Sequence, residues 1–199
     1  MNERSIVAVF DFDGTITTID TFRDFIVWHL GPFRFWIGML ATSPLIILYA
    51  MGFISNDIPK HVLFKLLYRN YPEVAFRAAC EHYARRRLPS LIRPKALSKI
   101  CYHLGEKHRV LIASASLIDW IEPWASSIGF ESVIATRALI RNDRLTGDFA
   151  DVCCYGHLKV VRRKEFGVSL DNSIIYAYGD SKGDSELLAY ADYSFYREF

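Results

Sequence analysis

The sequence predicts an α/β fold: a Rossmann-like, doubly wound parallel sheet into which an all-helical unit is inserted. Three observations predict this fold. Five apolar residues, Ile6 to Phe10, form the pattern of a short buried strand near the start of the chain. Beyond Pro94, strand patterns alternate with amphipathic helix patterns, the order that places helices on both faces of a parallel sheet. Between these parts, residues 18–89 carry helical patterns only.

Each expected element rests on a periodic pattern of apolar residues and on the residues that end it. Phe22, Phe25 and Ile26 recur at helical spacing, and Gly129 and Gly167 follow two later helices as stop signals. The expected helices are 20–30, 56–69, 72–87, 95–107, 117–128, 157–166 and 185–190. The expected strands are 6–10, 109–113, 132–135, 173–178 and 193–196, with a hairpin over 138–149 that turns at Asn142-Asp143.

These elements divide the chain into two units: residues 1–17 and 90–199 as the α/β core, and residues 18–89 as the helical insertion. Of the 199 residues, 51% are hydrophobic and 23% are charged, which excludes a disordered chain. The net charge of +2 is too small to favour nucleic acid as a partner. The four cysteines form no CxxC pair or Cys/His cluster, so no zinc site is expected.

Two carboxylates follow the first strand. Asp11 and Asp13 are two positions apart, so along an extended strand their side chains share one face while Phe12 turns to the core. Burying unpaired charge is costly, and a bound divalent cation would offset that cost. Gly14 then allows a turn or a close approach to a ligand, and the Thr15 hydroxyl could bind a phosphate. The alternative is an ordinary acidic turn.

Polar groups also follow two later strands, and a lysine begins a later helix. In doubly wound sheets the ligand site lies beyond the carboxyl ends of the strands. A cation in the first turn of a helix opposes the helix dipole, so Lys159 suggests a bound anion. The groups concerned are Ser114-Ala115-Ser116, Asp180-Ser181 with Asp184, and Lys159.

Together these groups suit phosphoryl transfer. Asp11 can attack phosphorus as a nucleophile, and Asp13 can act as general acid and then general base. Asp11, Asp180 and a backbone carbonyl near Asp13 can hold Mg²⁺, which prefers hard oxygen ligands. We assign phosphate contacts to Ser114, Ala115 and Lys159, with Gly14 and Thr15, and a supporting role to Asp184 and Ser181.

The motifs DFDGTIT, IASAS, GHLK and GDSKGD resemble, in order and spacing, the four motifs of the haloacid dehalogenase-like hydrolases. The resemblance covers 6–16 and 95–193 and implies the same roles for the same residues. The insertion looks like the helical cap of this family, and the core resembles the phosphoserine-phosphatase-like branch. Phosphoserine phosphatases carry Glu nine residues after the nucleophile, where this chain has Asp20, which we assign to substrate specificity.

Residues 35–56 contain no charged side chain and are long enough to span a membrane, but Pro44 lies in their middle. A single crossing would separate Asp11 from the later site residues. The alternatives are a re-entrant hairpin bent at Ser43-Pro44, an interfacial helix pair, or buried cap helices. Trp36 and Tyr49 favour the membrane surface. With no signal-peptide pattern, we expect a cytoplasmic protein, peripheral on the inner face of an anionic membrane.

Three hypotheses of function follow. The first is a Mg²⁺-dependent phosphomonoester phosphatase acting through an aspartyl-phosphate on a lipid phosphate, because the apolar stretch is similar to that of phosphatidylglycerophosphatase C enzymes. The second is a soluble phosphatase of small molecules such as phosphoserine. The third is a non-catalytic phospholigand-binding protein on the same scaffold.

Overall fold

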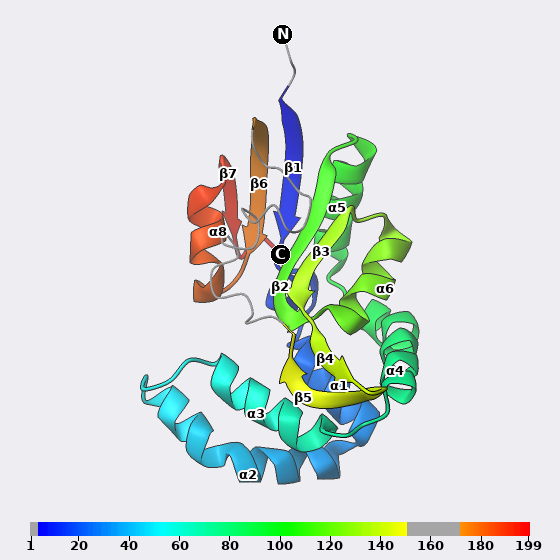
Figure 1. Cartoon of the computed structure of the whole chain (residues 1–199). Helices are drawn as coiled ribbons and strands as arrows, with labels where there is room; N and C mark the ends of the chain where they lie inside the picture. The colour runs from blue at the N-terminus through cyan, green and yellow to red at the C-terminus, as the bar shows by residue number, and fades with distance from the viewer. Residues whose placement is uncertain (1–3, 151–171) are drawn as a thin grey trace.

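The computed structural model describes residues 4–150 and 172–199 and contains a parallel five-stranded sheet in the order β3-β2-β1-β6-β7 (Figure 1). The predicted α/β fold with a parallel sheet is confirmed. Strand β2 continues beyond the expected end at residue 113, so Ser114 and Ser116 lie within it. The strands are β1 (Ser5–Phe10), β2 (Arg109–Leu117), β3 (Ser132–Thr136), β6 (Ser173–Gly179) and β7 (Tyr193–Tyr196).

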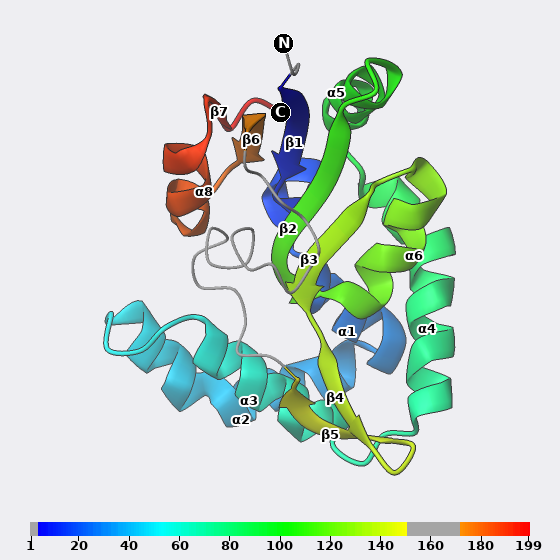
Figure 2. The ribbon, with the colours of Figure 1, turned by 45° about the horizontal axis from the view of Figure 1, so that its top comes forward.

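The central strand β1 contributes to two hydrophobic cores. Because strand residues alternate between faces, Ala8 and Phe10 enter one core while Val7 and Val9 enter the other, and all four are fully buried. The first core also contains residues of α5 (Pro94–Gly105) and α6 (Ile118–Ile128), and the second contains Leu187 of α8 (Ser185–Tyr190). The sheet is thus covered on both faces (Figure 2). The helix expected at 157–166 lies outside the described residues.

A helical unit lies beyond the carboxyl ends of the sheet strands (Figure 1). The hairpin formed by β4 (Ala138–Arg141) and β5 (Arg144–Phe149) turns at Asn142 and Asp143, both with positive φ, as the sequence predicts. Strand β5 packs against α3, although residues 138–149 belong to the range that we assigned to the core. The helices are α1 (Thr21–Leu30), α2 (Pro32–Ala50), α3 (Asp57–Tyr68) and α4 (Glu73–Arg86), followed by the short turn η2 (Leu88–Leu91).

Helix α2 runs through Pro44 without interruption, so the alternative of a re-entrant hairpin bent at Ser43-Pro44 is wrong. Proline lacks the N–H that would donate to the carbonyl four residues earlier, which is that of Leu40. Here the Ser43 hydroxyl donates to the Leu40 carbonyl at 2.8 Å instead. The side chain of the neighbouring serine therefore satisfies the acceptor that proline leaves without a partner.

Most of α2 is not buried by the described residues, which disfavours the alternative of a buried cap helix. The helix is long and apolar enough to cross a bilayer, yet only 17% of its apolar window is buried. Its buried residues are Phe35, Gly38 and Thr42. All of its exposed large apolar residues except Tyr49 share one side of the helix, which we call the outer face: Phe33, Trp36, Ile37, Leu40, Ile47 and Leu48.

Candidate active site

The two carboxylates of the first motif lie at the carboxyl end of the central strand. Asp11 follows β1, and its backbone N–H donates to the Tyr178 carbonyl at 2.9 Å, which continues the pairing with β6. Asp13 lies in the following short turn η1 (Phe12–Ile16), whose first residue, Phe12, is fully buried in the core. The turn depends on Gly14, which has a φ of +84°.

Asp11, Asp180 and Asp184 form an acidic cluster. One carboxylate oxygen from each lies within 4.8 Å of the others, and Asp11 and Asp184 are buried. Burial, together with the neighbouring Asp184 charge, raises the pKa of Asp11 well above its usual range and also raises the pKa of Asp180. Three converging carboxylates repel one another unless a cation lies between them, and hard oxygen donors suit Mg²⁺. The residues present therefore fit the magnesium ion that the family resemblance implies.

Two glycines allow the backbone to approach this cluster. A β-carbon on Gly14 would lie 2.5 Å from Asp180 Oδ2, and one on Gly179 would lie 2.6 Å from the Asp184 β-carbon. Both distances are shorter than van der Waals contact. Glycine at these positions is thus needed for the carboxylates to lie where they do.

Replacing Gly14 with alanine is expected to weaken Mg²⁺ binding about tenfold or more, because the new methyl group displaces the Asp180 carboxylate. The control is Gly31→Ala, since Gly31 has the same φ of +84° and no described residue lies within 4 Å of an added β-carbon. Both variants carry backbone strain of about 1–3 kcal/mol, but only the first crowds the cluster. Calorimetric titration with Mg²⁺ measures the difference, and equal affinities in the two variants would contradict this role of Gly14.

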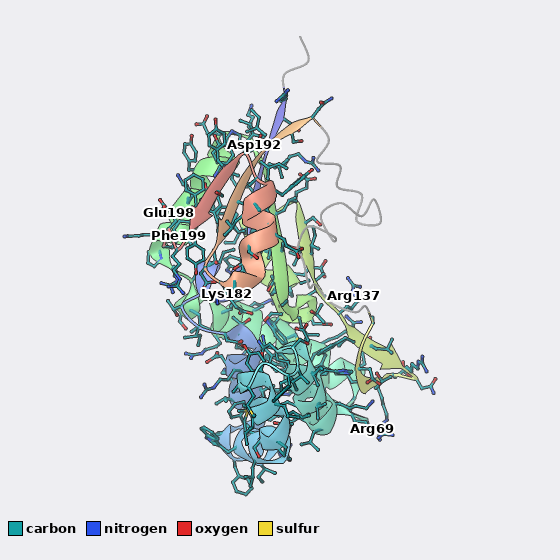
Figure 3. The ribbon with its side chains drawn as sticks, turned by 90° about the vertical axis from the view of Figure 1, so that its left-hand side faces the viewer. Arg69, Arg137, Lys182, Asp192, Glu198 and Phe199 are labelled. Carbon is teal, nitrogen blue, oxygen red and sulfur yellow. The ribbon has the colours of Figure 1, made fainter. Side chains whose placement is uncertain are left out.

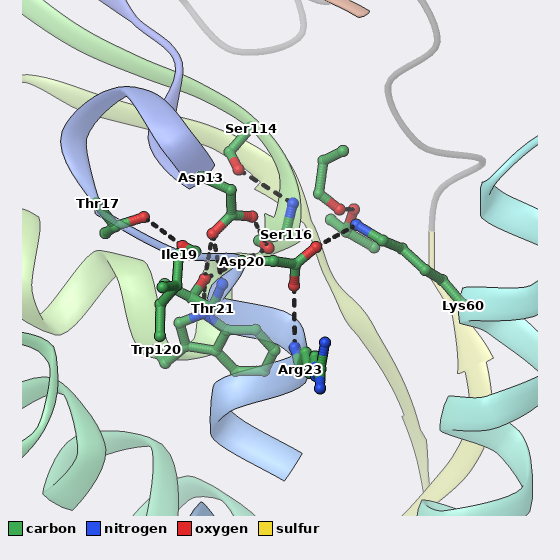
Figure 4. Close-up of polar contacts among 12 residues, drawn as sticks. Asp13, Thr17, Ile19, Asp20, Thr21, Arg23, Lys60, Ser114, Ser116 and Trp120 are labelled. Atoms are coloured by element: carbon green, nitrogen blue, oxygen red, sulfur yellow. Dashed lines mark hydrogen bonds and ion pairs between the residues drawn. The ribbon is translucent and has the colours of Figure 1, made fainter. Parts of the chain in front are cut away.

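Asp13 is held by donors on both carboxylate oxygens (Figure 4). The backbone N–H and the hydroxyl of Thr21 donate to Oδ1 at 2.8 and 2.6 Å, and the Ser116 hydroxyl donates to Oδ2. The Trp120 indole N–H donates to the Thr21 hydroxyl at 3.2 Å, which fixes that hydroxyl in turn. Burial raises the pKa of Asp13, and the nearby Asp20 charge adds to this effect. Asp13 is thus rigidly oriented and more readily protonated than an exposed aspartate.

The expected phosphate-binding residues differ in their environments. Ser114 is buried, lines the same cavity as Asp11 and Asp13, and accepts a hydrogen bond from the Ser116 N–H; Ala115 lines the cavity too and is exposed. The Thr15 hydroxyl donates to Asp180 Oδ1 at 3.3 Å, which differs from the phosphate contact that we expected of it. Lys159 lies outside the described residues.

Asp184 organises the loop after β6. It is the last residue of the short turn η4 (Lys182–Asp184). Asp184 Oδ2 accepts hydrogen bonds from the N–H and the hydroxyl of Ser181, at 2.9 and 2.8 Å, and from the Asp180 N–H at 3.2 Å. This reciprocal capping arrangement fixes the loop that carries Asp180. Asp184 and Ser181 thus hold the loop, while the Asp184 carboxylate also belongs to the acidic cluster.

Lys60 of α3 is a charged group at the site that motif patterns did not reveal. Its ammonium lies 3.3 Å from Asp20 Oδ2, and its side chain is 23% exposed. Burial opposes its charge, but the carboxylates of Asp20 and Asp13 outweigh this and raise the pKa of Lys60. Asp20, assigned to substrate specificity, also caps α1 by accepting the Arg23 N–H. The one sequence signal was that Lys60 is the first cation after the uncharged stretch.

These groups surround a cavity of about 480 Å³ between the sheet and the helical unit. Its size lies within the range of ligand pockets. Lys182 lies at the end of the sheet nearest the helical unit, so a second cation faces this opening (Figure 3). The cavity is lined by Asp11, Asp13, Asp20, Tyr49, Asn56, Asp57, Lys60, Ser114, Ala115, Ser181, Lys182, Gly183 and Asp184.

The sequence matches known proteins over almost its whole length. The model of the family of haloacid dehalogenase-like hydrolases matches residues 8–189, which include all the candidate site residues. The protein CicA of Caulobacter vibrioides is 34% identical over 207 aligned residues, which cover 100% of this chain and 89% of that protein.

Solved structures share the fold. A protein with unknown function from Bordetella pertussis Tohama I has a TM-score of 0.77 at 22% identity, and the match covers 93% of this chain and 86% of that one. A phospho-aspartyl intermediate analogue of phosphoserine phosphatase has a TM-score of 0.59 at 16% identity, covering 94% and 84%. At these identities the likeness concerns the fold. This fold likeness agrees with the resemblance to the phosphoserine-phosphatase-like branch, and the match to the family model confirms the haloacid dehalogenase-like hydrolase family.

Proposed function

This chain belongs to the haloacid dehalogenase-like hydrolase family, and from that premise we propose that it hydrolyses a phosphoric monoester through an aspartyl-phosphate on Asp11, with Mg²⁺ as cofactor. The observation that carries the proposal is the different environment of the two carboxylates at one strand end. Asp11 belongs to the acidic cluster, whereas Asp13 is held by Thr21 and Ser116. Two carboxylates in different environments suit two different chemical roles.

In the first step, an Asp11 oxygen attacks phosphorus, the bond from phosphorus to the leaving oxygen breaks, and Asp13 donates its proton to that oxygen. The raised pKa of Asp13 supports its role as the acid. When bound, Mg²⁺ supplies positive charge that lets a carboxylate approach a phosphate dianion. The Ser114 hydroxyl and the Lys159 ammonium are assigned to the phosphoryl oxygens.

In the second step, Asp13 removes a proton from water while the water oxygen bonds to phosphorus. The bond between phosphorus and Asp11 then breaks, which releases inorganic phosphate and leaves Asp11 as a carboxylate and Asp13 as the protonated acid, ready for the next cycle. The Thr21 and Ser116 hydrogen bonds, which stabilise ionised Asp13, keep it oriented for this return step. One residue therefore serves as acid and then as base.

We propose a lipid phosphate as substrate and the membrane surface as the place of reaction. Beyond Arg34 in its first turn, helix α2 carries no charged residue, and a helix this apolar is normally buried in protein or lipid. The described residues cover one side of α2 only, so its outer face remains for lipid. Arg34 on the same helix supplies a charge that suits anionic head groups.

Contacts at the two ends of α2 favour attachment to the surface over crossing. Asp20 precedes α2 along the chain and Lys60 follows it, yet the two form an ion pair at 3.3 Å. A hydrocarbon core is about 30 Å thick, so a crossing helix would separate them. We therefore propose a peripheral protein on the inner, cytoplasmic face of the membrane.

The alternative substrate is a small soluble phosphomonoester such as phosphoserine. The Asp20–Lys60 pair at the cavity favours this alternative, because opposite charges suit a zwitterion. A non-catalytic phospholigand-binding protein is the third hypothesis. It conflicts with the presence of both Asp11 and Asp13, since binding alone needs no acid–base residue.

A substrate panel tests the proposal. Purified protein is given p-nitrophenyl phosphate, phosphoserine, or vesicles that contain phosphatidic acid or phosphatidylglycerophosphate, and released phosphate is measured. We expect Mg²⁺-dependent release that is fastest from a lipid, that EDTA abolishes and that added Mg²⁺ restores. Activity in the presence of EDTA would reject the metal, faster release from phosphoserine would favour the small-molecule alternative, and no release from any compound would support the binding protein.

A further inference from the structure

An apolar groove runs between the helices of the inserted unit. It has a volume of about 240 Å³ and lies between α1, α2 and α3. Its walls are almost entirely apolar, with Phe22 from α1 and Leu63 from α3 among the buried side chains. The α2 wall consists of Phe35, Met39, Thr42, Ile46 and Tyr49.

The groove occupies one side of α2 and the outer face occupies the other. An α-helix advances about 100° per residue, so the five α2 residues in the wall fall within about 40° of one line along the helix. The outer-face residues point roughly 100–220° away from that line by the same count. The groove is therefore a separate apolar surface that a membrane in contact with the outer face would not fill.

The groove and the candidate active site adjoin each other and share four lining residues. Asp20, Tyr49, Asn56 and Lys60 line both the apolar groove and the acidic cavity. The ammonium of Lys60 lies at this junction, paired with Asp20 and 5.7 Å from the centre of the Phe22 ring. A molecule that places a phosphate at Asp11 could thus extend an apolar part past Lys60 into the groove.

We propose that this groove binds one hydrocarbon chain of the substrate. The inference rests on the proposed phosphatase function. It makes the substrate an amphiphile whose hydrocarbon chain contacts the groove along the length of the groove. Phe35 and Tyr49 are 14 positions apart, or about 21 Å along the helix axis. The chains of one membrane leaflet extend about 15 Å, half of the hydrocarbon thickness, so the groove is long enough to receive one of them.

Short-chain alkyl phosphates test the groove without a membrane. Phosphate release is measured from butyl, hexyl and octyl phosphate as dissolved monomers. We expect kcat/KM to rise about fourfold for each methylene that enters the groove, until the groove is full. Equal kcat/KM for butyl and octyl phosphate would overturn the proposal.

Paired tryptophan variants locate the effect. Ile46→Trp fills the groove from its α2 wall and should reduce the octyl-to-butyl ratio of kcat/KM to near one. Ile47→Trp makes the same change on the outer face and should keep the wild-type ratio. Met39→Trp and Leu40→Trp form a second pair with the same logic. Equal ratios within each pair would place the chain elsewhere and reject the groove.

A binding measurement separates failure of the groove from failure of the proposed function. Asp11→Asn cannot form the aspartyl-phosphate, so calorimetry with this variant measures the affinity for alkyl phosphates alone. We expect octyl phosphate to bind about 250-fold tighter than butyl phosphate if all the added methylenes enter the groove, and the gain to disappear when Ile46→Trp is added. If the wild type releases no phosphate but this gain persists, the phosphatase function fails and the groove stands. Equal affinities reject the groove whether or not the enzyme is active.

Discussion

Asp13→Asn is expected to release one equivalent of p-nitrophenol per protein from p-nitrophenyl phosphate in a single burst. Turnover should then be about 10²–10⁴-fold slower than in the wild type. The nitrophenolate leaves as a stable anion without a proton, so Asp11 can still be phosphorylated. Without Asp13 as a base, water attacks the aspartyl-phosphate slowly, and the phosphorylated protein accumulates. Rapid-quench kinetics and the mass of the intact protein measure the burst and the intermediate.

Asp11→Asn is expected to give the opposite result, with no burst and a turnover rate lower by about 10⁴-fold or more, because no nucleophile remains. With an alkyl phosphate, Asp13→Asn should also lose the first step, since an alkoxide needs a proton to leave. Asp143→Asn is the control, because residue 143 lies in the hairpin turn with a positive φ that asparagine adopts readily. A burst in Asp11→Asn, or none in Asp13→Asn with p-nitrophenyl phosphate, would overturn the assignment of roles.

The residues at the carboxyl edge of the sheet could be predicted because their signals are local. The run before Asp11 is apolar enough to define a buried strand, and β1 is buried at Val7 to Phe10. Asp180 and Asp184 also follow an apolar strand. Since parallel strands end at one edge, the sequence predicts that these carboxylates converge, and they lie within 4.8 Å of Asp11.

The hydrogen bonds to Asp13 could not be predicted because they depend on tertiary contacts, although Ser116 was among the polar groups expected at this edge of the sheet. Ser116 is 103 positions away and comes from a different strand, and Trp120 reaches Asp13 only through Thr21. A serine, a threonine and a tryptophan carry no spacing that distinguishes a hydrogen-bond network from ordinary packing. Lys60 likewise meets Asp20 only because α3 folds back beside the start of α1.

One alternative for α2, the hairpin bent at Ser43-Pro44, was wrong for a reason that lies in one side chain. Proline inside a helix normally disrupts it, which favoured a bend at residues 43 and 44. The serine before the proline supplies the missing donor to the Leu40 carbonyl, and the helix continues. The continuous helix keeps both apolar surfaces of α2 aligned along its length, which a bent hairpin would not do.

Leu40→Asp is expected to reduce binding to vesicles that contain an anionic phospholipid by about tenfold or more. Leu40 is 75% exposed on the outer face, and moving a leucine from water into an apolar environment contributes about 1.5–3 kcal/mol. Val74→Asp is the matched control, since Val74 is an equally exposed apolar residue (79%) on α4 and receives the same charge. Co-sedimentation with vesicles measures binding, and circular dichroism checks that both variants are folded.

The contrast between these two variants distinguishes attachment through the outer face from non-specific hydrophobic adsorption. If exposed apolar area alone caused binding, Val74→Asp would weaken it as much as Leu40→Asp. If anionic charge attracted the protein by itself, both variants would lose the same electrostatic contribution, and high salt would abolish the remaining binding. If vesicle binding falls only in Leu40→Asp, and if this difference between the variants persists at high salt, the outer face enters the apolar part of the membrane. Lipid would then lie next to the helix whose opposite side lines the route to Asp11. A wild-type protein that stays wholly in the supernatant would reject membrane attachment, and the apolar groove would then serve an amphiphile taken from solution.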